Sequence, residues 1–322
     1  MRKVFMMIFI LFATLTVIPY LIIINFSNKK DVRVIEPETV MVYIKEENRV
    51  EKMELNQYLK EVVSAEMPAQ FHPEALKAQA VAARTYLINR MRAYEKGEKP
   101  AEHMGADICT DSAHCKAWIS EEKRKKLWEK DKRQEYWKKI SDAVDNTGSL
   151  IVTYNSEPIS AVFHSTSSGY TENSEDVWTS QVAYLRSVKS EGDEKSPKFH
   201  SQKEMTLDEF KRIAEEKIEG VSWDDYIIGD IERSDAGGIK TIDVGGISVK
   251  GSDFRFMYDL RSANIQIEII EEVVKMDVKG YGHGVGMSQY GADYLARQGK
   301  NFEDILKTYY TGVSLDECKK ST

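Results

Sequence analysis

The chain lacks several features that would assign it to common functional classes. Its 322 residues carry a formal net charge of −7, an acidic balance that argues against a nucleic-acid partner. The glycine-rich segment 280–286 has neither the spacing of a Rossmann fingerprint nor a following Walker lysine, which excludes these two nucleotide-binding loops. No internal repeat is present. With 42% hydrophobic and 30% charged residues, the composition is otherwise that of a globular body.

Long apolar runs are absent except near the N-terminus. After Arg2 and Lys3, residues 4–24 carry no charge and are long enough to cross a bilayer. A cleaved signal peptide is the alternative, but no small-x-small cleavage site follows the run. We therefore expect a transmembrane anchor in residues 1–27 and a polar tether in residues 28–38. Basic residues flank both sides of the run, so charge does not decide its orientation.

The remaining pattern predicts an α+β body over residues 39–316, with a helical part packed on antiparallel strands. The capping box Thr206-x-x-Glu209 marks one helix start, and paired glycines mark turns between strands. Residues 100–146 form an excursion whose charge-rich stretch, 120–144, reads as one exposed helix. The expected strands lie at 40–44, 50–53, 150–154 and 159–164, within 226–250 and within 265–278. The other expected helices lie at 206–218, 287–297 and 302–310.

Glu66 is the most informative residue of the chain. The apolar side chains from Leu55 to Val62 recur at the spacing of one buried helix face, and Glu66 occupies the next position of that series. Pro68 disfavours helical geometry at the residue before it, so Glu66 should end the helix. A buried carboxylate has a raised pKa and can donate a proton at neutral pH, as a general acid does. The alternative is a Glu paired with a nearby Lys or Arg.

A second helix should begin at Pro73 and continue to about residue 94, before Gly97. Its many alanines allow other helices to pack closely. Lys77 and Arg84 lie two turns apart on one side and form a cationic edge, or are simply solvated charges.

Three segments of the chain carry a resemblance. In order along the chain they are "EMPAQFHPEALKAQAVAARTY", "FHSTSSGYTENSEDVW" and "GYGHGVGMSQYGA", the last followed by "YYTGV". They resemble the sequence blocks of the stage II sporulation protein D family, within the amidase-enhancer group of cell-wall proteins. The resemblance runs from about Leu55 to Tyr310. It implies a membrane-anchored lytic transglycosylase that cuts peptidoglycan glycan strands while the mother-cell membrane engulfs the forespore.

The resemblance also implies partners and residue roles. The catalytic carboxylate would be Glu66, and the body would lie outside the cytoplasm, facing the forespore septum. An amidase of the same engulfment machine and a membrane scaffold would be partners, and the amidase would supply glycan stripped of peptide. Lys77 or Arg84 would then pair with the lactyl carboxylate that a muramoyl residue exposes after that step.

A cluster of metal-binding residue types lies in the excursion. His103, Cys109, His114 and Cys115 place two imidazoles and two thiols within thirteen residues, the donor set of a closed tetrahedral zinc site. Such a site would be structural. Their spacing is not that of a zinc finger, and a disulfide between Cys109 and Cys115 is the alternative.

Two further motifs are candidates for sugar binding. Ser165, Ser167 and Ser168 belong to a hydroxyl-rich segment that the family places at the substrate groove, although such a composition is also typical of an ordinary loop. In segment 280–286, glycine at every second position removes side chains from one face, which permits close approach of a ligand or of another part of the backbone. The alternative to a binding role is a tight packing contact beneath the Glu66 helix. The family resemblance implies that His283 and Gln289 lie near the sugar.

The predicted reaction needs only one carboxylate. Glu66 would protonate the oxygen between N-acetylmuramic acid and N-acetylglucosamine, and a 1,6-anhydro ring would form without water. Hydrolysing glycosidases usually use a second carboxylate, for which Glu175 and Asp176 are candidates in a muramidase alternative. A wall-binding module that recruits or enhances an amidase is the non-enzymatic alternative.

Overall fold

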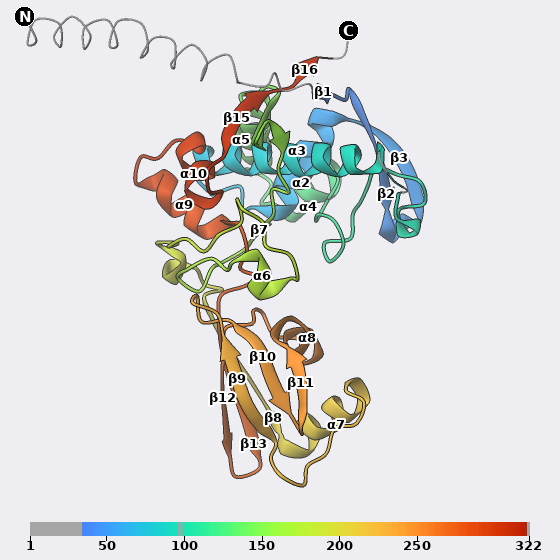
Figure 1. Ribbon diagram of the computed structural model, residues 1–322. Coiled ribbons are helices and arrows are strands. Elements are labelled where there is room, and N and C mark those ends of the chain that lie inside the picture. The colour runs from blue at the N-terminus through green and yellow to red at the C-terminus, as the bar shows by residue number, and fades with distance from the viewer. Residues whose placement is uncertain (1–33, 96, 98, 321–322) are drawn as a thin grey trace, which may run out of the picture.

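The computed structural model describes residues 34–320 except residues 96 and 98, and it has two parts that lie one above the other in Figure 1. The body is α+β with several small, mostly antiparallel sheets, as predicted. The predicted anchor and residues 28–33 of the predicted tether lie outside the described residues. Within the described ranges, no helix is long and apolar enough to cross a membrane.

The helices and strands have the following bounds. The helices are α2 (Leu55–Glu66), α3 (Pro73–Glu95), α4 (Glu121–Leu127), α5 (Arg133–Asp145), α6 (Ser174–Val177), α7 (Leu207–Lys217), α8 (Gly251–Met257), α9 (Gln289–Arg297) and α10 (Phe302–Tyr309). The strands are β1 (Ile35–Glu36), β2 (Thr39–Ile44), β3 (Arg49–Glu54), β4 (Ile108–Cys109), β5 (Leu150–Tyr154), β6 (Glu157–Pro158), β7 (Phe163–His164), β8 (His200–Thr206), β9 (Ile228–Arg233), β10 (Ile239–Val244), β11 (Ile247–Lys250), β12 (Ile265–Ile270), β13 (Val273–Lys279), β14 (Met287–Ser288), β15 (Ser314–Glu317) and β16 (Lys319–Lys320).

The larger part is built around α3. Helices α2, α5, α9 and α10 and strand β5 pack against it, so α3 is buried on several sides (Figure 1). Its alanines, including Ala78 and Ala82, are fully buried in the main hydrophobic core. Small side chains on α3 therefore allow the neighbouring helices to approach closely, as the sequence predicted.

The smaller part has a hydrophobic core of its own. Two three-stranded sheets, β11-β10-β9 and β12-β13-β8, carry α7 and α8 (Figure 1). The rings of Phe210 and Tyr258 stack in this core, with centroids 4.6 Å apart. The predicted helix start at Thr206 is confirmed, because Thr206 Oγ1 accepts a hydrogen bond from the Glu209 amide. The hairpin of β12 and β13 is also confirmed.

The secondary structure differs from the expectation in three places, the first of which is the expected strand 159–164, where only Phe163–His164 (β7) is a strand. The charged stretch 120–144 forms two helices instead of one exposed helix, because the chain is extended at Trp128, and α5 buries Trp137 and Ile140. Strand β8 was not predicted, since its sequence is mostly polar. It pairs with β13 over its full length, and that pairing provides backbone hydrogen bonds along one side of β8.

The two ends of the described chain meet. Strand β1 pairs in parallel with β16 at the end of the larger part farthest from the smaller part (Figure 1). Residues 34–38, which were expected to belong to the tether, therefore include a strand that contacts the body.

Candidate active site

Glu66 lies at the C-terminal end of α2, as the sequence predicted. Met67 has extended geometry, with φ −117° and ψ 143°, because Pro68 follows it. The Glu66 side chain is partly buried and lines a cavity of about 570 Å³ between the two parts of the molecule. The helix end therefore presents the carboxylate to an internal surface that a ligand can reach.

Two hydrogen bonds hold the Glu66 carboxylate. The Ala117 amide donates to Oε1 at 2.9 Å, and Gln289 Nε2 donates to Oε2 at 3.3 Å. Burial raises the pKa of Glu66 above its ordinary value, while the Lys116 ammonium and these two donors act in the opposite direction. The net shift is upward. No ion pair with Glu66 is present among the described residues, although the charge of Lys116 is near enough to act on the pKa of Glu66.

Lys116 is the nearby cation that the sequence did not reveal. Its side chain is buried, and its Nζ lies 3.7 Å from the ring centroid of Phe163 and 4.2 Å from that of Tyr86. Burial lowers the pKa of Lys116 to about 8, although Glu66 acts to raise it. The pair of aromatic rings thus holds a positive charge close to the carboxylate.

Both parts of the molecule supply walls of the cavity. The larger part contributes Phe163, Ser165 and Trp178, and α8 of the smaller part contributes Arg255 and Phe256. The Trp178 side chain is 42% exposed and that of Phe256 is 70% exposed. Such exposed rings beside a polar cavity suit stacking on the apolar face of a sugar.

The two histidines at the cavity are neutral and differ in what they can bind. The Val285 amide donates to His283 Nδ1, and His283 Nε2 lies 3.1 Å from the Phe163 carbonyl, so both nitrogens are engaged by the backbone. Burial lowers the pKa of both imidazoles, and that of His164 to about 4. His164 Nδ1 lies 3.2 Å from the Val285 carbonyl, whereas its buried Nε2 has no partner among the described residues. His164, which was not predicted, therefore has the free acceptor atom, and His283 contributes its ring face.

The serine-rich and glycine-rich motifs pack against each other. Gly286 has φ +74°, and a Cβ on it would lie 2.2 Å from the Val162 carbonyl oxygen. Strand β14 pairs with β7, and a bridge joins Thr166 to Tyr281. The close approach that the glycines permit is thus made by backbone 162–168, and not by the Glu66 helix.

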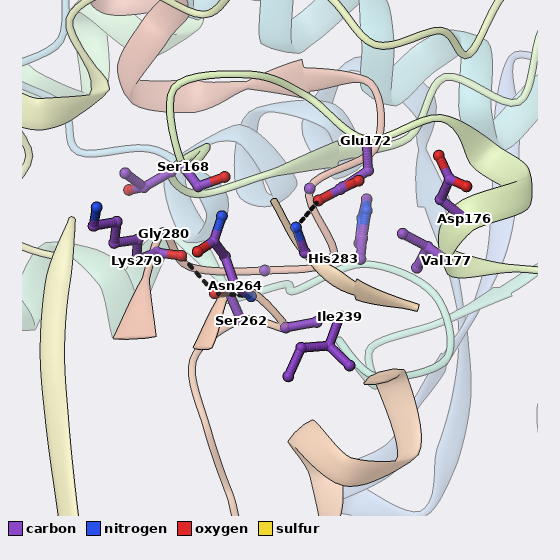
Figure 2. Close-up of a pocket in the computed structure, with 15 residues that line it drawn as sticks. Ser168, Glu172, Asp176, Val177, Ile239, Ser262, Asn264, Lys279, Gly280 and His283 are labelled. Atoms are coloured by element: carbon purple, nitrogen blue, oxygen red, sulfur yellow. Dashed lines mark hydrogen bonds between the residues drawn. The ribbon is translucent and has the colours of Figure 1, made fainter. Parts of the chain in front are cut away.

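A small pocket lies next to the main cavity at the junction of the two parts. Figure 2 shows Ser168 and Glu172 of the larger part facing Ser262 and Asn264 of the smaller part across it. The Gly238 amide donates to Glu172 Oε1 at 3.2 Å, which ties the two parts together.

The three predicted serines have three different environments. Ser165 lines the cavity that contains Glu66. Ser167 is buried and donates to the Tyr170 carbonyl, and Ser168 lines the adjacent pocket. Gln289, predicted to lie near the sugar, is buried, donates to Glu66 Oε2 and also donates to Gln79 Oε1.

Lys77 and Arg84 do not line the cavity. Lys77 forms an ion pair with Glu74 at 2.7 Å, in a surface depression beside α5. Arg84 is fully buried, donates to Thr147 Oγ1 and lies 3.2 Å from a Glu36 carboxylate oxygen of β1. The structure therefore gives no support to a contact between these two cations and a ligand bound beside Glu66.

The predicted metal-binding residues come together. The donor atoms of His103, Cys109, His114 and Cys115 all lie within 4.8 Å of one another. Cys115 Sγ lies 3.2 Å from His103 Nε2, and Cys109 Sγ lies 3.4 Å from His114 Nδ1. Ligands around a tetrahedral zinc ion are roughly 3.4–3.8 Å apart, so the donor set fits a metal of this kind. Both thiols are free.

The loop that carries these four residues also lines the cavity that contains Glu66. Ser112 and Ala113 of the loop line it, and the residues that follow Cys115 are Lys116 and Ala117. The Ala117 amide donates to Glu66, so the segment that directly follows the four predicted ligands contacts the carboxylate.

The carboxylates named for the muramidase alternative differ in position. Arg186 binds both oxygens of Glu175, which lowers the pKa of Glu175 to about 2, and Glu175 does not line the cavity. Asp176 does line it, and an oxygen of its carboxylate lies 3.5 Å from Lys240 Nζ.

Comparison with known proteins gives a consistent picture. Residues 43–154 match the family model of the stage II sporulation protein. The chain is 40% identical to stage II sporulation protein D of Bacillus subtilis (strain 168) over 282 residues, which cover 88% of this chain and 80% of the relative. Its counterpart from Bacillus amyloliquefaciens is also 40% identical. The amidase enhancer of Bacillus subtilis is 27% identical over 80% of this chain and 40% of its own length.

Proposed function

The chain belongs to the stage II sporulation protein D family, and from that membership we propose that it is a lytic transglycosylase of peptidoglycan that acts in engulfment during endospore formation. The single observation that carries this proposal is Glu66, a carboxyl of raised pKa in a cavity with aromatic walls. Its substrate would be denuded glycan strands. Residues 1–27 would anchor the chain in the mother-cell membrane with the body outside the cytoplasm, and an engulfment amidase and a membrane scaffold would be its partners.

In the first step Glu66 acts as a general acid. Burial keeps its carboxyl protonated to higher pH than an exposed Glu, so it can donate a proton to the oxygen that links N-acetylmuramic acid to N-acetylglucosamine. The bond from the muramoyl anomeric carbon to that oxygen breaks, and N-acetylglucosamine leaves with the proton. Ala117 and Gln289 hold the resulting carboxylate through their hydrogen bonds.

In the second step the same group acts as a base. The Glu66 carboxylate takes the proton of the muramoyl C6 hydroxyl, whose oxygen bonds to the anomeric carbon and closes a 1,6-anhydro ring. No water is consumed, and Glu66 ends protonated for the next cycle. A second carboxylate is not required, which is consistent with the ion pair that holds Glu175.

We propose zinc as the metal of the His103, Cys109, His114 and Cys115 cluster. Two thiolates and two imidazoles complete a tetrahedral shell and leave no open position, so the ion would be structural. Its contribution would be to fix the loop that continues into Lys116 and Ala117.

The product ends test the proposed reaction. The full chain, incubated with purified denuded glycan, should release oligosaccharides that end in 1,6-anhydro-muramoyl groups, which mass spectrometry distinguishes from reducing ends by the missing water. Reducing ends would support the muramidase alternative, with Asp176 as the second carboxylate. No soluble product would support the wall-binding module, an alternative that the likeness to an amidase enhancer favours.

The pH profile should respond to Gln289. Activity should fall as pH rises through the pKa of Glu66, because the proton to be donated is then lost. Gln289 favours the carboxylate by donating to it, so Gln289→Met should raise the pKa further and move the alkaline limb of kcat/KM to higher pH. A Gln298→Met variant, altered on the same helical segment outside the cavity, should keep the original profile. A shift to lower pH in Gln289→Met would contradict this role.

A further inference from the structure

Arg255 lines the cavity that contains Glu66, and its guanidinium has no ion-pair partner among the described residues. It lies on α8, and its Nε donates to the Leu260 carbonyl at 3.1 Å. Among the described residues no carboxylate pairs with it. Burial lowers its pKa, which means that its surroundings disfavour the charge. A partly buried guanidinium of this kind is stabilised when an anion binds to it.

Of the twelve described arginines, six pair with a carboxylate and six, Arg255 among them, do not, so the feature that distinguishes Arg255 is its place in the wall of the cavity. Carboxylates lie beside buried and exposed arginines alike: Arg84 with Glu36, Arg92 with Glu157, Arg186 with Glu175, Arg212 with Glu216 and Arg297 with Asp293. Arg255 instead lines a cavity of about 570 Å³ that is open to a ligand. The arrangement matches a binding site for an anion from outside the chain.

The walls beside Arg255 indicate what carries that anion. Phe256 lies in the last turn of α8 and is exposed, and Trp178 and Tyr281 line the same cavity. His164 Nε2 adds a buried acceptor without a partner among the described residues. Aromatic faces and a lone acceptor suit a sugar ring with hydroxyl groups. Together with the Arg255 guanidinium, these walls would suit a sugar that bears an acidic group.

We propose that Arg255 binds the carboxylate of the lactyl group on the N-acetylmuramic acid unit, with Phe256 stacking on a neighbouring ring. This inference rests on the proposed function, and it gives Arg255 the role that the sequence had suggested for Lys77 and Arg84. The planar guanidinium fork matches a carboxylate with two hydrogen bonds. Since N-acetylglucosamine has no carboxylate, Arg255 determines which sugar occupies this end of the cavity. When a peptide caps the lactyl group as an amide, the charge that Arg255 binds is lost.

The test measures binding separately from cleavage. The full chain carrying Glu66→Gln is titrated calorimetrically with a denuded glycan tetrasaccharide and, separately, with chitotetraose, which lacks lactyl groups. Adding Arg255→Gln should weaken binding of the denuded tetrasaccharide about tenfold or more and change chitotetraose binding by less than about twofold. Arg212→Gln removes the same charge from the same part of the molecule outside the cavity, and it should change neither affinity.

A test on the ligand side avoids the risk that Arg255→Gln misfolds through loss of the Leu260 contact. The tetrasaccharide whose lactyl carboxylates are converted to amides should bind the Arg255-containing chain about tenfold more weakly than the free acid. Equal affinity for the acid and the amide would overturn the inference. An equal loss of affinity for the denuded tetrasaccharide and for chitotetraose in Arg255→Gln would also overturn it. If the chain with Glu66 intact cleaves nothing but discriminates acid from amide, the proposed function fails and the anion site stands. If the chain releases anhydro products but does not discriminate acid from amide, the proposed function stands and the anion site fails.

Discussion

Replacing Glu66 with Gln is expected to abolish cleavage while glycan binding persists. Glutamine keeps nearly the same shape and can still accept from the Ala117 amide, but it can neither donate a proton to the glycosidic oxygen nor later accept one from the C6 hydroxyl. General acid–base groups contribute roughly 10²–10⁴-fold to rate, and here one residue has both roles, so activity should fall by at least that factor. Release of anhydro ends and glycan affinity are the two measurements.

The matched control is Asp176→Asn, which changes another carboxylate that lines the same cavity. Under the one-carboxylate mechanism this variant retains cleavage with anhydro product. Thermal unfolding of both variants shows whether either loses its fold. Wild-type cleavage by Glu66→Gln, or loss of cleavage in a folded Asp176→Asn, would require the proposed mechanism to be abandoned.

Loss of the predicted metal site should have the second largest effect. The full chain purified without added metal should contain about one zinc per chain by elemental analysis, since structural zinc binds tightly enough to contribute directly to folding free energy. Cys109→Ser should lower that content and lower the unfolding temperature. Cleavage should fall as well, because the loop that ends at Cys115 continues into the Ala117 amide that holds Glu66.

Cys318→Ser provides the control for this prediction. Cys318 is also buried, but it lies near Val34 and Ile151 away from the cluster, so its replacement should leave the zinc content unchanged. Absence of zinc together with a Cys109 to Cys115 disulfide in a peptide map would contradict the metal site and support the alternative considered from the sequence.

Local signals explain what could be predicted from the sequence. Helix α2, its end at Glu66 and the start of α3 at Pro73 follow from apolar spacing and from proline, both of which act within a few residues. The metal cluster was found because its four ligands are close together in the chain.

Residues defined by long-range packing could not be found in this way. Arg255 and Phe256 reach the cavity only because the smaller part folds against α6, and nothing in their neighbourhood in the sequence signals it. Arg84 was expected on an exposed edge, but α3 is covered on several sides, so its charge pairs with Glu36 in the interior. For His283, the spacing of the glycines indicated close approach without identifying the backbone of 162–168 as the neighbour.

The smaller part leaves the larger part and returns to it at one place. His200 and Lys279 are paired across β8 and β13, and the Gly280 amide donates to the Phe199 carbonyl at 2.7 Å. Phe199 and Gly280 are therefore neighbours in space, and the chain between them is, for the core of the larger part, equivalent to one long loop. Insertions are tolerated at junctions of this kind. In evolutionary terms the segment that carries Arg255 can therefore be lengthened, shortened or exchanged by recombination without refolding the part that holds Glu66. The proposed selectivity for the glycan and the proposed chemistry of cleavage would then be inherited as separate modules.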